Sequence, residues 1–237
     1  MSQYWLYGKH PIISTLNNPC RTNLELLLTP NAKDYLVNKG IDISKVSYKL
    51  TTNQTISKLI KQDEAAHQGI CLKTKILKQP LLEELDYDEK ATIILLDKVS
   101  DPGNIGAIIR NAAAFEAQAV ITTKDGSPYE NAGIVKSSAG TFEQVPYIHA
   151  TNLTRCIEHL KEHNFWSFAL TQRATANLDI LREYPRKAII LGAEGKGIRP
   201  NILKACDMEV RINISQRVES LNVSNAAAVC LFASFSQ

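Results

Sequence analysis

The stretch ATIILLDKVSDPGNIGAIIRNAAAF, residues 91–115, decides the fold class of this chain. Residues 91–97 are a continuous apolar run of strand length, which is typical of a strand covered on both faces. Pro102 and Gly103 turn the chain, and Asn104 is a favourable N-cap for a helix that we expect over 104–117. The apolar residues that recur at helical spacing, and that should be buried, are Ile105, Ile108, Ile109 and Ala112.

The remainder of the second half repeats this alternation of strand and helix. Further strands are expected at 119–123, 165–171, 187–194 and 209–214. A helix is expected at 151–163, and an almost wholly apolar one from about 221 should be buried in the core or against another subunit. This order predicts an α/β domain with a mostly parallel sheet, whose ligands gather beyond the carboxyl ends of the strands.

The front of the chain has a different character. Residues 1–76 alternate short helical and strand patterns and predict a separate small α/β domain. Residues 77–90, with five acids and one proline, are interpreted as the linker to a second domain over 91–237, although 81–86 could also form a surface helix. Residues 1–80 carry 11 Lys and Arg against 5 Asp and Glu, whereas residues 81–237 carry 16 against 19. The basic front favours a polyanionic partner, and a lysine-rich solvated surface accounts for the charge as well.

Composition excludes several classes of protein. No run approaches 18 apolar residues, so no membrane span is expected, and the start MSQYWLYGKHP lacks the pattern of a secretory signal. The 5 cysteines form no C-x-x-C pair and lie at no zinc spacing from histidines. We therefore expect a cytoplasmic protein with reduced, mostly buried thiols and no metal site.

Arg110 stands on an unusual helix face. It lies off the apolar stripe, and its neighbours one turn away are Gly106, Ala107, Ala113 and Ala114. Such small side chains allow a ligand or another backbone to approach closely. The alternative is an ordinary solvated arginine on an alanine-rich surface.

Two further loops follow apolar strands. In LGAEGKGIRP, residues 191–200, the glycines permit unusual backbone angles, and Glu194 could accept hydrogen bonds from amides or pair with a cation. This loop matches neither a P-loop nor a dinucleotide-binding fingerprint. Before the final helix, the polar residues Ser220, Asn222, Ser224 and Asn225 are more than capping requires, with Ser220 a favourable cap.

Taken together, the segments NIGAIIR, GAEGKG and SLNVS, in this order, resemble the three motifs of the TrmH/SpoU branch of the SPOUT RNA 2′-O-ribose methyltransferases. The resemblance covers residues 91–237 closely. More loosely, YGKHPIISTL near the start and HQGI at 67–70 are similar to the substrate-binding domain of the bacterial 23S ribosomal RNA guanosine methyltransferases of this family.

The resemblance implies a fold, a cofactor and site residues. The catalytic domain should end in a deep trefoil knot that binds S-adenosylmethionine, with Gly192, Ile212 and Leu221 holding the cofactor largely through backbone groups. The implied catalytic residues are Arg110, Asn104, Glu194, Ser220 and Asn222. The family acts as homodimers, which would account for the small-residue face around Arg110 and for the apolar last helix. Asn213, Gln216 and Asn225 depart from the family pattern and touch the expected donor pocket.

The expected activity is methyl transfer from S-adenosylmethionine to a ribose 2′-hydroxyl, as a step of ribosomal RNA processing, with a guanosine of 23S ribosomal RNA as the expected target. Arginine is a poor base because its pKa lies above about 12, so we assign Arg110 to gripping a phosphate and stabilising the developing alkoxide. Within the enzyme class, a transfer RNA 2′-O-methyltransferase or a resistance methyltransferase remains open. From another class, a non-catalytic RNA- or ribosome-binding protein remains open.

Overall fold

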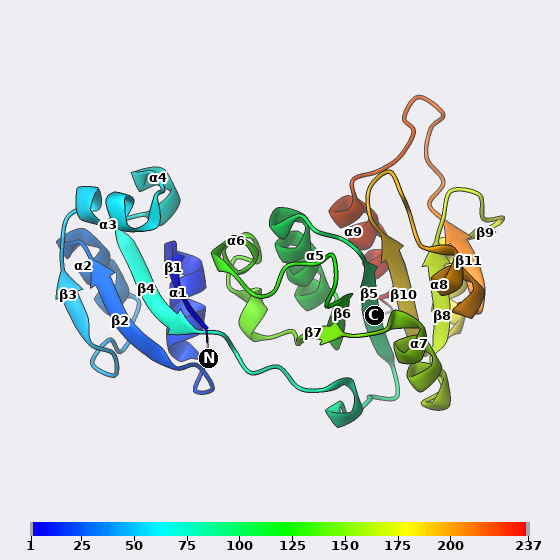
Figure 1. Cartoon of the computed structure of the whole chain (residues 1–237), viewed down its shortest axis with the longest axis horizontal. Coiled ribbons are helices and arrows are strands. Elements are labelled where there is room, and N and C mark those ends of the chain that lie inside the picture. The colour runs from blue at the N-terminus through cyan, green and yellow to red at the C-terminus, as the bar shows by residue number, and fades with distance from the viewer. Residues whose placement is uncertain (1, 236–237) are drawn as a thin grey trace. The chain divides into compact units, whose positions relative to one another are not determined.

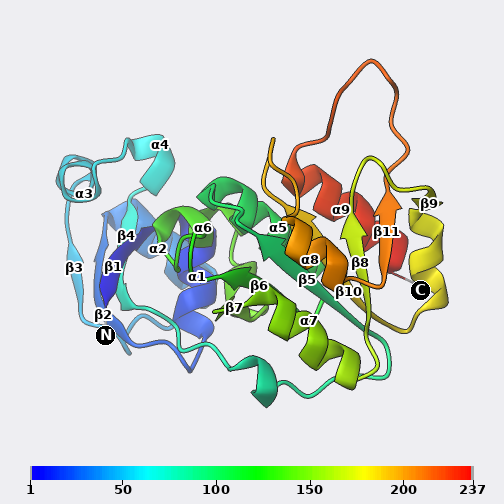
Figure 2. The same ribbon diagram turned by 45° about the vertical axis from the view of Figure 1, so that its right-hand side comes forward.

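The computed structural model describes residues 2–235, and these form two compact units. Unit 1 comprises the residues up to Lys78 together with Glu130–Glu143, and unit 2 comprises Gln79–Tyr129 and the residues from Gln144 onward. Figures 1 and 2 show the elements of each unit. Unit 1 therefore combines the front of the chain with a short segment that the sequence places far behind it.

Unit 1 is a four-stranded sheet with helices. The strand order is β1-β4-β2-β3, and only the β2–β3 pair is parallel. The strands are β1 (Gln3–Tyr7), β2 (Asn23–Leu28), β3 (Tyr48–Leu50) and β4 (Ile70–Lys75). The helices are α1 (Lys9–Asn17), α2 (Pro30–Asn38), α3 (Asn53–Ile60), α4 (Glu64–His67) and α6 (Ala132–Ser137), with the 3₁₀ turn η2 at Thr141–Glu143. Helices and strands alternate along most of the front of the chain, as the pattern of residues 1–76 predicts.

Unit 2 is built on a parallel sheet of order β7-β6-β5-β10-β8-β11-β9. The strands are β5 (Ala91–Asp97), β6 (Ala119–Thr123), β7 (Tyr147–Ala150), β8 (Trp166–Leu170), β9 (Ala176–Asn177), β10 (Arg186–Gly192) and β11 (Met208–Arg211). The remaining elements are α5 (Pro102–Ala114), α7 (Leu153–Glu162), α8 (Pro200–Ala205), α9 (Val223–Ser234) and the 3₁₀ turns η1 (Leu82–Glu84) and η3 (Leu178–Glu183). The α/β architecture with a parallel sheet is confirmed.

Helices cover both faces of this sheet. On one face α7 and α8 pack through Leu153, Ile157 and Ile202. These side chains share one hydrophobic core with buried residues of the sheet of unit 2. On the other face α5 packs against α9, and the predicted stripe of α5 (Ile105, Ile108, Ile109, Ala112) has no exposed surface. The central strand β5 is buried along its whole length, as its continuous apolar run predicts.

Some local predictions were wrong. The cap of α5 is Asp101 rather than Asn104, because the helix begins at Pro102 and the Asp101 side chain accepts a hydrogen bond from the Asn104 amide. The cap of α9 is Asn222 rather than Ser220. The possible surface helix at 81–86 is only the single turn η1. Among the described cysteines, four are buried or half-buried, and Cys20 is exposed.

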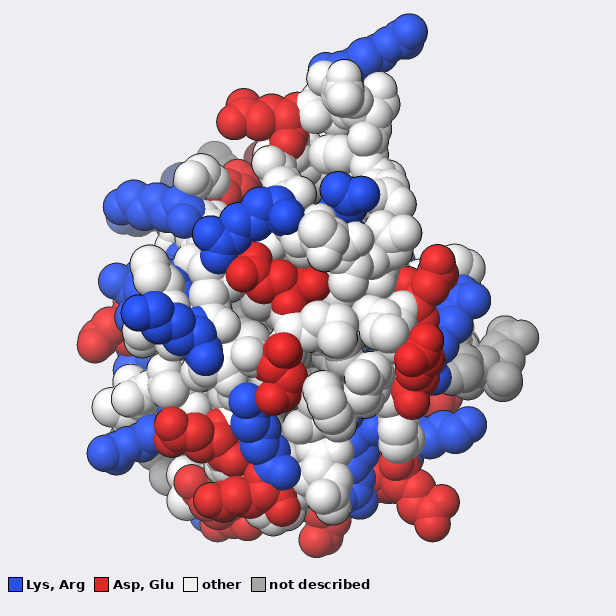
Figure 3. All heavy atoms as spheres, turned by 90° about the vertical axis from the view of Figure 1, so that its right-hand side faces the viewer, with Lys and Arg blue, Asp and Glu red and all other residues white. Residues whose placement is uncertain are grey.

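The surface of unit 2 mixes charges. On the face drawn in Figure 3, Lys and Arg side chains lie among Asp and Glu side chains instead of forming one basic field. This fits the near balance of 16 cationic and 19 anionic residues over 81–237. Within residues 2–235, no helix has both the length and the apolar character needed to cross a bilayer.

Candidate functional site

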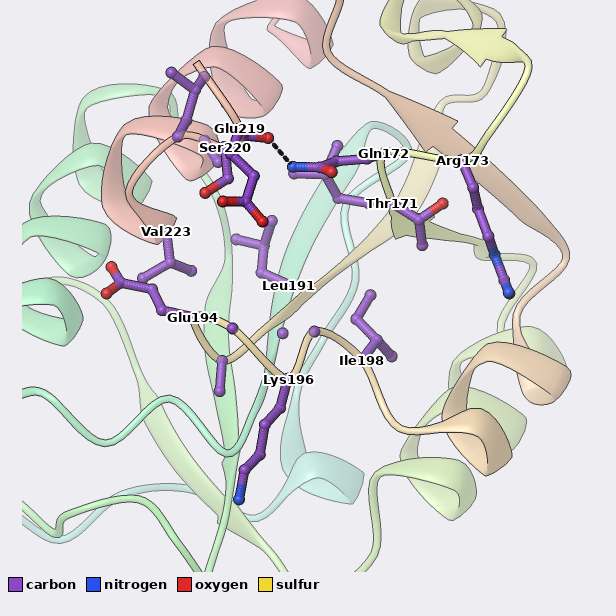
Figure 4. A pocket seen from close by; sticks show the side chains of 17 residues that line it. Thr171, Gln172, Arg173, Leu191, Glu194, Lys196, Ile198, Glu219, Ser220 and Val223 are labelled. Atoms are coloured by element: carbon purple, nitrogen blue, oxygen red, sulfur yellow. Dashed lines mark hydrogen bonds between the residues drawn. The ribbon is translucent and has the colours of Figure 1, made fainter.

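A cavity of about 410 Å³ opens beyond the carboxyl ends of β8 and β10 (Figure 4). It is lined by residues 170–173 after β8, residues 191–198 after β10, and residues 219–221, 223 and 226 around the start of α9. All three stretches belong to unit 2. The cavity therefore lies at the edge where parallel sheets bind their ligands.

The glycine loop after β10 is folded back tightly on itself. A Cβ atom at Gly192 would lie 2.2 Å from the carbonyl carbon of Gly197, so no larger residue fits at this position. Gly195 and Gly197 have φ angles of +78° and +64°, which glycine adopts without strain. The amide of Gly197 donates to the carbonyl of Ala193 at 2.9 Å. The loop is thus fixed by its own backbone in a conformation that requires glycine.

Asp97 anchors both ends of this loop, and sequence reasoning missed it. It ends β5, is 1% exposed, and its carboxylate accepts from the Arg199 backbone amide at 2.9 Å and from Arg199 Nε at 2.8 Å. The carbonyl of Asp97 also accepts from the Ala193 amide at 3.1 Å. The available signal was an acid at the end of an otherwise apolar strand, because such a buried charge requires a partner.

Three predicted site residues meet in one hydrogen-bonded cluster, and one of them, Glu194, also lines the cavity. Asn222 Nδ2 donates to Glu194 Oε1 at 2.8 Å and to Asn104 Oδ1 at 2.9 Å. Asn104 Nδ2 makes a longer contact of 3.4 Å with the same Glu194 oxygen. These residues come from α5, the glycine loop and the cap of α9, which are far apart in the sequence. The structure thus brings together Asn104, Glu194 and Asn222, three of the five implied catalytic residues.

The cluster is held in place by the helix starts beneath it. Asn222 Oδ1 accepts from the backbone amide of Ser224 at 2.8 Å and from its hydroxyl at 2.6 Å. Asn111 of α5 donates to the carbonyl of Ser224 at 3.2 Å, which ties α5 to the first turn of α9. Asn222 therefore combines two tasks, since one side of its amide caps a helix and the other orients Glu194.

Arg110 is not part of this cluster. Its side chain is exposed, and it makes no hydrogen bond or ion pair with the residues that the structure describes. Arg110 and Asn104 both lie on α5, but six residues of helix separate them by about 9 Å along the axis and turn their side chains roughly 120° apart. One chain by itself does not bring this guanidinium to the cluster.

The other predicted residues divide into two groups. Gly192, Ser220 and Leu221 line the cavity, whereas Ile212, in the segment after β11, does not. A missed residue, Gln172, follows β8 and donates to the carbonyl of Glu219, which joins two walls of the cavity (Figure 4). Glutamine in a loop carries no pattern that would have revealed this role.

The lining is suited to a ligand with a flat apolar part and a positive charge. Leu170, Leu191, Ile198, Leu221 and Val223 supply apolar surface. Glu194 and Glu219 supply carboxylates, while the side chains of Lys196 and Arg173 extend away from the cavity in Figure 4. This set fits S-adenosylmethionine, which combines an adenine ring with a sulfonium. Among the described residues, no group of His, Cys, Asp and Glu could hold a metal ion.

Comparison with known proteins agrees with these features. Residues 91–232 match the model of the SpoU rRNA Methylase family. The chain is 34% identical to the 23S rRNA (guanosine-2′-O-)-methyltransferase RlmB of Vibrio parahaemolyticus over 241 residues, covering 98% of this chain and 96% of the relative. The RlmB of Nitrosomonas europaea is also 34% identical and covers 100% of this chain and 92% of its own length.

Solved structures show the same fold at low sequence identity. The SpoU methyltransferase AviRb of Streptomyces viridochromogenes, in complex with AdoMet, superposes with a TM-score of 0.83 at 18% identity, covering 98% of this chain and 89% of its own. An AdoMet-bound rRNA methyltransferase of Sinorhizobium meliloti gives a TM-score of 0.82 at 20% identity, covering 98% and 86%.

Proposed function

Because the chain belongs to the SpoU rRNA Methylase family, we propose that it transfers a methyl group from S-adenosylmethionine to the ribose 2′-hydroxyl of a guanosine in 23S ribosomal RNA. The observation that carries this proposal is the convergence of Asn104 and Asn222 on Glu194, which lines the cavity. Relatives covering nearly the whole chain bear the name of this activity. A ribosomal RNA substrate also supports a cytoplasmic location.

S-adenosylmethionine, when bound, supplies a methyl group on a positively charged sulfur. We propose that the loop backbone at Gly192 and the walls at Leu221 and Ile198 hold this cofactor in the cavity. By the motif match we propose that Ile212, in the segment between β11 and α9, also contacts the cofactor. The carboxylate of Glu194 would balance the positive charge at the mouth of the cavity.

The 2′-hydroxyl must be aligned and must lose its proton. We propose that Asn104, Asn222 and Ser220 orient the sugar, since amides and hydroxyls can both donate and accept hydrogen bonds. Alignment alone contributes roughly 7–11 kcal/mol to such reactions in favourable cases. Arg110 is proposed to grip the target phosphate with its planar guanidinium and to stabilise the developing alkoxide.

Since Arg110 does not reach the cluster of its own chain, we propose a homodimer in which Arg110 comes from the partner subunit. Two observations support this arrangement. The exposed face of α9 carries Phe232, 65% exposed, and Val229, 38% exposed. Phe232 also packs edge-on against Phe115 at the end of α5, which extends the apolar surface to the helix that bears Arg110. Apolar surface of this kind is typical of an interface.

We further propose that residues 1–76 bind the RNA, that residues 77–90 act as the linker and that residues 91–237 form the catalytic domain, whose carboxyl-terminal part is a trefoil knot. The excess of 11 Lys and Arg over 5 Asp and Glu in residues 1–80 supports delivery of an RNA, whose phosphates dominate binding. The matched family model, which begins at residue 91, supports the division.

The activity is tested by incubating the protein with labelled S-adenosylmethionine and, separately, with unmodified ribosomal and transfer RNAs. We expect label in 23S ribosomal RNA, at one guanosine ribose located by primer extension. Label in transfer RNA alone would assign the protein to the transfer RNA methyltransferases of the family. Cofactor binding without transfer to any RNA would leave an RNA-binding protein.

The dimer is tested by sedimentation of the wild-type protein and of the Phe232→Glu variant. We expect a dimer for the former and a monomer without methyltransferase activity for the latter, because the new charge would be buried in the interface. Trp166→Glu, a change at another exposed aromatic, is the matched control and should remain dimeric. A monomeric wild-type protein that is fully active would contradict the proposal.

A further inference from the structure

A second group of cationic and aromatic side chains lies on the carboxyl edge of the sheet, and the proposed catalytic site does not use it. Lys124 directly follows β6, His149 belongs to β7, and Arg155 lies in the first turn of α7. Lys124 and Arg155 are exposed. All of these residues, and Tyr129, belong to unit 2.

Tyr129 and His149 form a stacked pair of rings. Their centroids are 4.2 Å apart and their planes are inclined by only 16°. His149 is fixed from two sides, since its Nε2 lies 3.2 Å from the carbonyl of Pro128 and its ring packs edge-on against Tyr147 at 4.7 Å. Burial lowers the pKa of His149, so the imidazole in this stack stays neutral at ordinary pH. Tyr129 nevertheless remains 54% exposed, which makes it a rigidly supported aromatic surface.

A cavity of about 460 Å³ adjoins this stack. His149, Lys124 and Arg155 line it together with residues 150–152, and Glu83 is the acid in its lining. His159 also lines it, and its Nε2 is buried without a hydrogen-bond partner among the described residues. A buried polar atom left unbonded in this way costs free energy unless a ligand completes it.

The location relates this group to the proposed catalytic cluster. β5, β6 and β7 are parallel neighbours, with Leu96 paired to Thr122 and Thr123 paired to Ala150. Two strand spacings amount to about 10 Å, so the stack lies within one or two nucleotides of the end of β5, near the start of α5. Lys98, the residue that follows β5, continues the row of cations along the same edge.

We propose that Tyr129, His149 and the adjoining cavity form a subsite that holds an unpaired base of the RNA substrate, with Lys124 and Arg155 contacting the neighbouring phosphates. Stacking on an aromatic ring suits any base, and flanking cations suit a nucleic-acid strand better than a protein surface. The subsite rests on the proposed function for the identity of the RNA. Stacking of a base and contact with phosphates require only that the RNA be single-stranded.

The stacking of a base is tested with Tyr129→Ala and Tyr129→Trp, using a short oligoadenylate and unmodified 23S ribosomal RNA as probes. Tyr129→Ala should weaken binding of both RNAs by about tenfold or more and raise the KM for 23S RNA without changing kcat. Tyr129→Trp should restore binding because it keeps a flat ring. Trp166→Ala is the matched control, since Trp166 is 44% exposed and packs on Tyr184 at 4.6 Å, but lies at the amino end of β8. S-adenosylmethionine affinity and the unfolding midpoint should be unchanged in all variants.

The role of the two cations is tested by salt dependence. In the Lys124→Gln, Arg155→Gln double variant, the slope of log affinity against log salt should fall by about 0.7 for each phosphate of a single strand that the variant no longer neutralises. Lys90→Gln, at the amino end of β5, should leave the slope unchanged.

The outcomes for Tyr129→Ala separate the subsite from the proposed function. If Tyr129→Ala binds both RNAs within twofold of wild type, while the wild-type protein methylates its RNA, the subsite is overturned and the function stands. Failure of that variant to bind oligoadenylate, with no methylation of any RNA by the wild type, would support the subsite and overturn the function.

Discussion

Two arginines of this chain show how surroundings decide the role of a charge. The side chain of Arg21, in unit 1, has no exposed surface and is enclosed by Glu130 and Glu143, with a contact of 2.7 Å to Glu143. Arg110, in unit 2, is exposed and makes no hydrogen bond to any residue of 2–235. The first guanidinium has all its partners within the fold, so its task is structural. The second is left for a ligand or another subunit.

The largest effect on stability is expected from Arg21→Ala. This change leaves Glu130 and Glu143 buried beside each other without a counter-charge, which costs roughly 3–5 kcal/mol. Glu130 also receives hydrogen bonds from Tyr4 and the Leu77 amide, so it cannot turn away easily. Denaturant unfolding followed by circular dichroism should show an early transition of unit 1. A destabilisation below about 1 kcal/mol would mean that the two glutamates become protonated or solvated at little cost.

Arg110→Ala should have the opposite profile. We expect methyl transfer to slow by about 10²–10³-fold, the usual effect of removing one group that stabilises a developing negative charge, with no change in the unfolding midpoint. Arg110→Lys keeps the charge without the planar fork and should stay at least about tenfold below wild type. Activity of the lysine variant near that of wild type would contradict the proposed fork.

Mixing two inactive variants tests which subunit of the proposed dimer supplies the arginine. Neither Arg110→Ala nor Asn222→Ala should be active alone. If Arg110 acts on the partner's cluster, random exchange of subunits should restore about a quarter of wild-type activity, since half of the dimers are mixed and each has one intact site. Absence of any recovery after exchange would place Arg110 and Asn222 of one chain in the same site.

Asp97 shares a feature with each arginine. It is buried and paired as Arg21 is, and it positions a loop of the proposed site to which Arg110 also belongs. Asp97→Asn should weaken S-adenosylmethionine binding by roughly 1–3 kcal/mol, since the new amide group would face donors of Arg199 instead of accepting from them. Calorimetry on the free protein measures this change in affinity. Asp125→Asn, at the exposed end of the neighbouring strand, is the control and should bind as wild type does.

Sequence reasoning succeeded where one short-range pattern decides the structure. The apolar run at 91–97 and the stripe Ile105, Ile108, Ile109 follow from periodicity alone, and they are buried as predicted. The meeting of Asn104, Glu194 and Asn222 followed because parallel strands deliver their loops to one edge of the sheet. Family motifs then distinguished this edge from a generic nucleotide site.

The failures concern interactions that no local pattern encodes. Asp101 and Asn104 are both good caps, and only the turn made by Pro102 decides between them. Residues 130–143 pack with the front of the chain, where Glu130 and Glu143 meet Arg21, more than 100 positions away in the sequence. Arg110 is exposed and has no hydrogen bond or ion pair among residues 2–235, so the fold of one chain supplies no partner for it.

The smallest effect on stability is expected at the ion pair of a third arginine. Arg173 is paired like Arg21 but exposed like Arg110, with a contact of 3.0 Å to Glu209. Hydrogen bonds from Arg173 and Thr171 lower the pKa of Glu209 from its usual 4.5. A carboxyl with a depressed pKa in the folded state adds stability above its unfolded pKa and loses it as the pH falls through the folded value. Glu209→Gln should therefore leave the unfolding midpoint at pH 7 almost unchanged and slightly flatten its decline below about pH 4.5. A large destabilisation at pH 7 would show that this ion pair stabilises the fold substantially even though it is exposed to solvent.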